Sequence, residues 1–459
     1  MDFSAANVDL WHPIIQIGII SGLLLVANTL RRKVAFIRNS LMPTSVLAGF
    51  ILLLLRYTNI VNMGTDFLEV VTYHALALGF IALSLRTSDK KESNVALVKS
   101  KSGALIVSTY LVQAIVGLII SIGLGLTFMP NLFKASGILL PMAYGQGPGQ
   151  ANNVGTTYEG LGMVGGRSFG LSLAAVGFLC ACVVGVIYLN ILHRKGKVQR
   201  IKDKDEVSGS VTIEMFQDKN EIPVAESVDK LSVQVALIML IYLVTFLAIK
   251  GVTEGLELVS PGLAKTVGSI LWGFNFIVGS LIASLACLAF RHLRHFKVMN
   301  HQYQNNYLLS RLSGLAFDVM IIAGIASINI DDLSGYWLPF VLMAIAGAVV
   351  TLWYLQIMCK KLYGDYYYEG LLSMFGMLTG TLSSGVLLLR EIDPNLETPA
   401  SDNLVYGSSF GIAFGAPVLL LVSFAGKGDL YTYVVLGLAA LYLMALLLFI
   451  LKAGKKKAK

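Results

Sequence analysis

Residues 135–157 read ASGILLPMAYGQGPGQANNVGTT, an apolar segment whose centre is broken by glycine, proline and amide side chains. A second segment, GLLSMFGMLTGTLSSGVLLL at 370–389, is broken in the same way by glycine and hydroxyl side chains. Irregular backbone at membrane depth is tolerated only where protein or a water-filled cavity surrounds it. The two segments therefore predict re-entrant hairpins, over about 135–157 and 369–390.

The composition around these segments indicates an all-α integral membrane protein. Of 459 residues, 56% are hydrophobic and only 14% are charged, whereas soluble domains carry about 25% charged residues. The net charge of +8 comes from basic residues in short loops, which is typical of membrane orientation and excludes nucleic acid as the expected partner. The four cysteines lie within or beside apolar runs, without metal-ligand spacing,.

Apolar runs of helical length predict five spans before a polar linker and six after it. The first five are Trp11–Leu30, Pro43–Leu55, Phe67–Leu85, Gly103–Phe128 and Gly166–Leu192. The last six are Leu231–Ile249, Ala264–Phe290, Tyr307–Ile328, Trp337–Leu355, Asn403–Phe424 and Tyr431–Leu451. We thus expect a first repeat at 1–192, a cytoplasmic linker at 193–230, a second repeat at 231–425, and an extra span with a basic tail at 426–459.

The distribution of basic residues predicts the orientation of these spans. If the N-terminus lies outside the cell and the first span is retained, all but six of the 35 Lys and Arg residues fall on the cytoplasmic side, as the positive-inside rule predicts. The exceptions are Arg56, Lys134, Arg167, Lys250, Lys265 and Lys427. Counting either broken segment as a full span spoils this distribution. We expect a multi-pass protein of the cell membrane with a cytoplasmic C-terminus.

Each predicted repeat carries five spans, so the two repeats are expected to cross the membrane in opposite directions. GRSFGLSLA at 166–174 is similar to GSSFGIAFG at 407–415, and both begin the span that follows a broken segment. Inverted repeats with paired interrupted helices are typical of secondary transporters that bind their substrate near the middle of the bilayer. The expected partners are a small anionic substrate, sodium and membrane lipid.

The first broken segment offers groups that could bind a solute. An unwound backbone presents carbonyl groups to a cation, and helix N-termini present N–H groups to an anion. The simpler alternative is a glycine-rich turn. Arg167 opens the next span and faces either an anionic substrate or the membrane interface. The expected substrate-binding residues here are Tyr144, Gly145, Gln146, Gly147, Gly149, Gln150, Asn152, Asn153 and Arg167.

The second broken segment supplies hydroxyl and carbonyl oxygens of the kind that suit sodium. We expect substrate contacts at Gly376, Thr379, Gly380 and Thr381. The alternative is a surface of small residues that lets helices pack closely. Asp318 lies inside an apolar span, where a carboxyl group either serves function or is paired within the bundle. The expected sodium ligands are Gly145, Asp318, Thr381, Ser383 and Ser384.

No nucleotide loop, catalytic triad or metalloprotease motif occurs in the sequence, so we expect neither an enzyme nor an ATP-driven pump. Ion gradients remain as the source of energy. Sodium-coupled symport is the main hypothesis. Proton coupling through Asp318 and an uncoupled channel or facilitator remain as alternatives.

The segments GILLPMAYGQGPGQANN and GLLSMFGMLTGTLSSG, followed by GGRSFGLSLAAVG and YGSSFGIAFGAP, resemble the paired motifs of the bacterial sodium/glutamate symporter family. The resemblance covers the order of spans across most of the chain. It implies that Gly145, Gly147, Gly149, Gly376 and Gly380 frame the substrate and sodium sites. It further implies symport of glutamate or a related small carboxylate by a homodimer, through an elevator mechanism in which a transport domain slides past a fixed scaffold.

Overall fold

The structure, a computed structural model, describes residues 2–4, 7–39, 42–86, 93–198, 229–273, 275–299, 301–393 and 398–452. Every regular element in these ranges is a helix. Most of the expected linker at 193–230 and the basic tail from 453 onward lie outside the described residues. The all-α prediction is thus confirmed for the described part of the chain.

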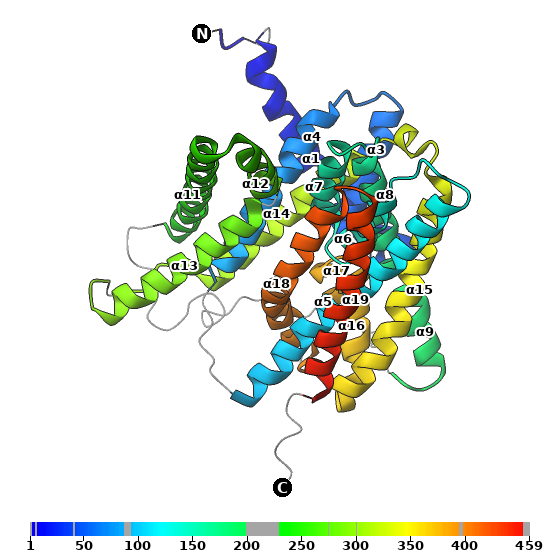
Figure 1. Cartoon of the computed structure of the whole chain (residues 1–459). Coiled ribbons are helices and arrows are strands. Elements are labelled where there is room, and N and C mark those ends of the chain that lie inside the picture. Colours follow the sequence, from blue (N-terminus) through cyan, green and yellow to red (C-terminus); the bar gives the residue numbers. More distant parts are fainter. Residues whose placement is uncertain are drawn as a thin grey trace. The chain divides into compact units, whose positions relative to one another are not determined.

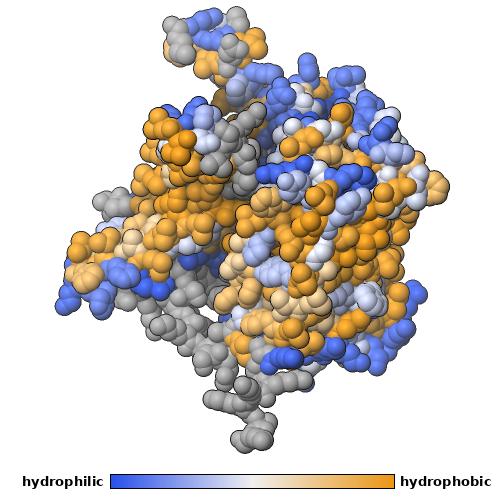
Figure 2. Space-filling view, in the orientation of Figure 1, coloured by the Kyte–Doolittle hydropathy of each residue, from blue (hydrophilic) through white to orange (hydrophobic). Residues whose placement is uncertain are grey.

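Nine helices in the described residues are long and apolar enough to cross a membrane. Two shorter apolar stretches, Thr44–Tyr57 and Phe410–Ala425, accompany them. Large apolar side chains are exposed along these helices, including Leu441 at 58% and Val349 at 63%. Figure 2 shows hydrophobic residues gathered over helices α15 and α19 and hydrophilic residues beyond their ends. The long apolar helices and their exposed apolar side chains are those of a multi-pass membrane protein.

The chain forms two compact units, and each contains residues from both predicted repeats. The first unit comprises Met1–Thr65, Lys91–Asp203 and Gly324–Lys459, and the second comprises Asp66–Lys90 and Lys204–Ala323. Both broken segments belong to the first unit. The candidate site therefore lies within the first unit.

The first unit is built from long spans and two pairs of short helices (Figure 1). Its elements before the linker are α1 (Val8–Lys33), α2 (Ala35–Asn39), α3 (Thr44–Tyr57), α5 (Ser93–Leu126), η1 (Lys134–Ile138), α6 (Leu139–Tyr144), α7 (Pro148–Glu159), α8 (Gly166–Leu179), η2 (Cys180–Val184) and α9 (Gly185–Arg194). Its later elements are η3 (Asp331–Leu333), α15 (Trp337–Leu362), η4 (Gly364–Tyr366), α16 (Tyr367–Thr379), α17 (Leu382–Leu389), α18 (Ala400–Ala425) and α19 (Asp429–Lys452).

Helix α5 is the central element of this unit. Its 34 residues give a length of roughly 51 Å, and it packs against α15, α18, α19 and η1 (Figure 1). Helices α5 and α18 run parallel, because Lys99 pairs with Asp402 at 3.6 Å and Gly103 lies against Gly407 one turn further on. Close approach at Gly103 is possible because glycine has no side chain.

The segment 134–159 forms a helical hairpin, which we call hairpin 1. Its outgoing arm is η1 and α6, and its returning arm is α7. The rings of Phe133 and Tyr158 lie 5.3 Å apart, so the two arms begin and end at the same level. That level is the C-terminal end of α18, because the Tyr158 hydroxyl donates to the Val422 carbonyl at 2.9 Å.

The segment 367–389, made of α16 and α17, forms hairpin 2. Its arms are antiparallel, since a methyl group added at Gly376 would lie 2.8 Å from the Ser384 carbonyl oxygen. Hairpin 2 begins at the opposite end of α18, where the Asn403 amide donates to the Tyr366 hydroxyl at 2.9 Å. The two hairpins therefore enter the unit from opposite ends of the α5–α18 pair.

The second unit contains α4 (Thr65–Ser84), α11 (Lys230–Val259), α12 (Pro261–Gly273), α13 (Asn275–His295) and α14 (Asn306–Ala326), although the outermost residues of α4 and α14 belong to the first unit. Its core includes Ile81, Leu85, Ile238, Ile241 and Ala283. The span predicted over 264–290 falls on α12 and α13, and Phe274 between them lies outside the described residues.

Glycine contacts between backbones hold hairpin 1 against α5, and they give a test of the fold. A methyl group at Gly117 would overlap the carbonyl group of Gly137, which is backbone and cannot turn aside. Gly117→Ala is therefore expected to destabilise the protein by about 1–3 kcal/mol. The measurement is the thermal unfolding midpoint in detergent.

Gly123→Ala on the same helix is the matched control, because no atom lies within 4 Å of the added methyl group. It is expected to keep or raise the midpoint, since alanine favours helix over glycine by roughly 1 kcal/mol. Equal midpoints for the two variants would contradict the close packing of α5 on η1.

Candidate functional site at the tips of the two hairpins

The tips of hairpins 1 and 2 meet inside the first unit. A methyl group at Gly147 would lie 3.6 Å from Thr381 Cγ2 and 3.7 Å from the Gly380 carbonyl oxygen. Both tips are places where a helix ends and another begins, so their turns carry backbone groups without intrahelical partners. The meeting of two such turns in the interior of the unit is the feature that marks this place as a candidate site.

The tip of hairpin 1 depends on two glycines. Gly147 has a φ of 83° and stands directly before Pro148, the first residue of α7. That backbone conformation suits glycine, and proline suits the first position of a helix. Gly145 packs so closely on the Tyr110 ring that a side chain there would overlap it. The conformation of this tip is therefore fixed by its backbone geometry and by its packing.

The tip of hairpin 2 is formed by Gly380 and Thr381. Thr381 is the N-cap residue of α17 in an extended conformation, yet its side chain makes no capping hydrogen bond. Its Oγ1 is buried and has no partner among the described residues. A threonine at this position usually caps the helix, so its hydroxyl group is available to a ligand.

Helices α5 and α8 enclose the junction. Gln113 of α5 is fully buried and donates to the Leu378 carbonyl at 2.9 Å and to Thr351 Oγ1 at 2.8 Å. Gly177 of α8 packs against the carbonyl group of Thr379. The π-helical turn η2 begins three residues later, at Cys180. Such turns occur frequently at functional sites.

Sequence reasoning did not identify Gln113. The available signal was an uncharged polar side chain in the middle of an apolar span, which is costly unless it is bonded. Ser172 on α8 was missed for a different reason, because it lies in a run of small residues that is also typical of helix packing.

Several buried polar atoms of hairpins 1 and 2, and of the helices α5 and α8 that enclose their tips, have no hydrogen-bond partner within the described part of the chain. They are Gln113 Oε1, Gln150 Oε1, Asn152 Oδ1, Ser172 Oγ, Thr381 Oγ1 and Ser384 Oγ. Leaving a buried polar group unpaired costs about 1–3 kcal/mol. Unpaired atoms of this kind are therefore expected where a ligand or water completes their hydrogen bonds.

Helix dipoles add an electrostatic pattern at the tips. Helices α7 and α17 begin at the tips, and helices α6 and α16 end there. Helix N-termini favour negative charge, and helix C-termini favour positive charge. The junction thus offers N–H groups to an anion and carbonyl or hydroxyl oxygens to a hard cation such as sodium.

Other predicted residues serve the packing of the tips. The Tyr144 hydroxyl donates to the Ala344 carbonyl at 2.8 Å, and the Thr379 hydroxyl donates within its own helix to the Phe375 carbonyl at 2.7 Å. Gly376 is on the face of α16 that packs against α17, where it permits the close approach of the two helices. Gly149 and Asn153 are buried in the first two turns of α7, and Gln146 is partly exposed at the tip.

Three predicted residues are not gathered at the tips. Arg167 is the second residue of α8, about ten residues and roughly 15 Å along the helix from Gly177,. Asp318 lies on α14 within the second unit and is partly buried. The side chain of Ser383 lies outside the described part of the structure. The roles assigned to these residues stay predictions.

Glu159 lies close to Arg167, at the open end of hairpin 1. Its Oε1 accepts the backbone N–H of Arg167 at 3.0 Å. Burial raises the pKa of this carboxyl group, the N–H of Arg167 opposes that shift, and the nearby carboxylate of Asp332 adds to it. The open end of hairpin 1 therefore carries an ionisable carboxyl group, that of Glu159, whereas the residues named at the tips carry no formal charge.

Comparison of the chain with models of known protein families and with curated protein sequences gives no match.

The contact between Gln113 and hairpin 2 predicts a local effect on stability. Gln113→Leu removes both donated hydrogen bonds and leaves the Leu378 carbonyl unpaired, at an expected cost of about 1–3 kcal/mol. Hydrogen exchange of the α16–α17 amides, together with the unfolding midpoint, measures it. Gln356→Leu is the control, because Gln356 is only partly buried and donates to the Tyr188 hydroxyl. Similar exchange in both variants would contradict the assignment.

The raised pKa of Glu159 predicts a dependence of stability on pH. Between the ordinary pKa of glutamate and the raised value, the folded chain holds a proton that the unfolded chain has lost. The free energy of unfolding therefore falls as the pH rises through this interval. Glu159→Gln is expected to remove that fall, measured as the unfolding midpoint against pH. Exposed Glu254→Gln is the control; an unchanged profile for Glu159→Gln would show the prediction to be wrong.

Proposed function

We propose that the chain is a secondary active transporter that couples sodium entry to the symport of glutamate or a related small carboxylate. The observation that carries the proposal is the meeting of Gly147 with Gly380 and Thr381 in the interior of one unit. Broken helices that meet in this way are what transporters use to bind a solute and its coupling ion together.

The lengths of the arms support the description of these hairpins as re-entrant. Helix α7 has 12 residues and α17 has eight, or roughly 18 and 12 Å. Neither can cross a hydrocarbon layer of roughly 30 Å. Because the hairpins enter from opposite ends of α18, their arrangement also agrees with two inverted repeats.

The chemistry of the tips supports an anionic solute with a cation beside it. The N-terminal turns of α7 and α17 would bind the carboxylate, assisted by the Gln150 and Asn152 amides. Thr381 Oγ1, Ser384 Oγ and the carbonyl oxygens of the tips would bind sodium, a hard cation that prefers oxygen. No fixed countercharge is needed when helix ends supply partial charges.

The resemblance to sodium/glutamate symporters supports the finer parts of the proposal. These are a homodimer, an elevator movement of the hairpin-bearing unit, and a cell membrane location with the N-terminus outside. Proton coupling through Asp318 is the nearest alternative within the same class. A channel or facilitator would line its pathway with the same tips but would not accumulate its solute.

Uptake of labelled glutamate into proteoliposomes tests the proposal. We expect accumulation above equilibrium with an inward sodium gradient and none with a proton gradient alone. Thr381→Val is expected to raise the sodium concentration for half-maximal uptake about tenfold, which corresponds to about 1.4 kcal/mol of binding free energy. It removes the unpaired hydroxyl and keeps the shape of the side chain.

Thr245→Val is the matched control, because the Thr245 hydroxyl is buried and donates within its own helix to the Ile241 carbonyl at 2.7 Å. It is expected to leave the sodium dependence unchanged. Uptake that stops at equilibrium would favour a facilitator. Accumulation driven only by protons would overturn sodium coupling, and an equal effect of both substitutions would remove Thr381 from the site.

A further inference from the structure

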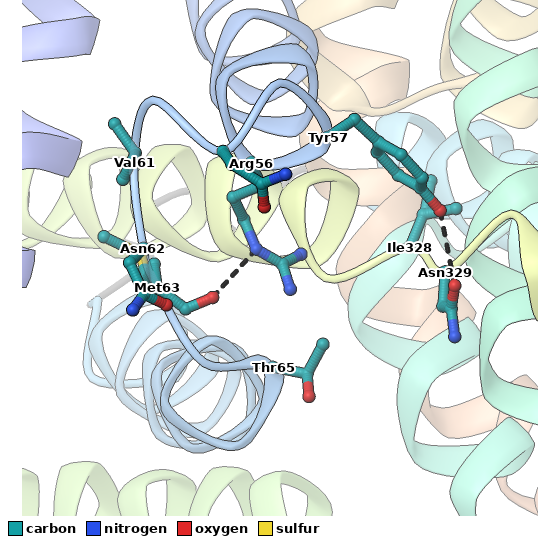
Figure 3. A pocket seen from close by; sticks show the side chains of 9 residues that line it. Arg56, Tyr57, Val61, Asn62, Met63, Thr65, Ile328 and Asn329 are labelled. Carbon is teal, nitrogen blue, oxygen red and sulfur yellow. Dashed lines mark hydrogen bonds between the residues drawn. The ribbon is translucent and has the colours of Figure 1, made fainter.

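A polar pocket of about 380 Å³ lies in the first unit, apart from the hairpin tips. It is formed where α3 ends, by the loop that follows it, and by the segment after α14 (Figure 3). Its volume falls in the range of small-molecule sites, roughly 300–1,000 Å³. Nothing in the proposed transport site uses it.

Arg56 is the only formally charged side chain among the residues that line this pocket in the described structure. Its Nε donates to the Met63 carbonyl at 2.9 Å, and its Nη1 donates to the Ala326 carbonyl. A guanidinium group has five N–H donors in a fixed fork. The two carbonyl bonds therefore hold the group in place, and Figure 3 shows its free end directed into the pocket toward Thr65.

The remaining lining is polar but neutral. Tyr57, Asn59, Asn62, Thr65 and Asn329 contribute hydroxyl and amide groups. A half-buried guanidinium group without an acidic neighbour in the lining favours an anion, and its forked donors match a carboxylate. The amide oxygens can accept hydrogen bonds from an ammonium group on the same ligand.

A chain of hydrogen bonds connects the pocket with the base of hairpin 1. The Tyr57 hydroxyl donates to Asn329 Oδ1 at 3.3 Å, and the backbone N–H of Asn329 donates to Ser168 Oγ at 3.3 Å. Ser168 in turn donates to the Asp332 carboxylate at 2.8 Å. Ser168 lies in the first turn of α8, so the pocket is at the end of the unit where hairpin 1 opens.

We infer that this pocket is a second binding site, for a small organic carboxylate, in which Arg56 binds the carboxylate group. The site is distinct from the hairpin tips and binds its ligand independently of them. Only its location on the outer face of the membrane rests on the proposed function. There it would collect the anionic solute at the entrance on the hairpin 1 side.

Protection of Arg56 from phenylglyoxal tests this inference on the wild-type chain in detergent. Modification of Arg56 and of exposed Arg390 is followed by mass spectrometry in sodium chloride, sodium glutamate and sodium glutarate of equal ionic strength. We expect the carboxylates to slow modification of Arg56 at least threefold and to leave Arg390 unaffected. Equal rates at Arg56 in all three salts, or an Arg56 that does not react in chloride, would overturn the inference.

Two variants separate the pocket from the tips and from a purely structural role of Arg56. Asn62→Ala leaves both carbonyl bonds of Arg56 intact and is expected to raise the half-protecting concentration about fivefold, the loss of roughly one hydrogen bond. Thr381→Val is expected to leave protection unchanged. Protection lost in Thr381→Val, or unaltered in Asn62→Ala, would refute a separate site. If glutamate is not transported but Arg56 is still protected, the proposed function fails and the pocket stands.

Discussion

A helix that stops in an apolar interior leaves backbone N–H and C=O groups that must find partners, and the first unit is organised around that requirement. Two helical hairpins turn inside it, at Gly145–Gly147 and at Gly380–Thr381. The two turns pack against each other, and α5 and α8 pack beside their junction. Close approach is achieved with glycine, as at Gly177, where the carbonyl group of Thr379 takes the place that a side chain would fill.

The polar groups at this junction are dipoles rather than full charges. Amides, hydroxyls and helix ends cost much less to bury than an ionised side chain. Formal charges lie toward the ends of the unit, as in the pairs of Lys99 with Asp402 and of Lys134 with Asp429. An anionic solute and a cation that bind together at the tips would therefore supply the charges that the protein does not place there.

The helical architecture and the breaks within the two interrupted segments could be predicted from sequence, because glycine, proline and amide residues in an apolar run are a local signal. The partners of each tip could not. Gln113 contacts Leu378 from a distant part of the chain, and no local pattern reports such a contact. The sequence also could not distinguish a hydroxyl that faces a ligand from one that bonds its own helix, as the contrast between Thr381 and Thr379 shows.

The contact of Gly147 with Thr381 joins turns from the two halves of the sequence, and this affects how the protein is made. During synthesis, hairpin 1 emerges long before hairpin 2 exists. Its tip must then remain without its cover while the linker and most of the second half are translated and inserted. Closure of a loop this large is entropically costly and slow. The junction thus cannot become native until the second half has been made, and until then the tip of hairpin 1 lacks the cover that hairpin 2 gives it.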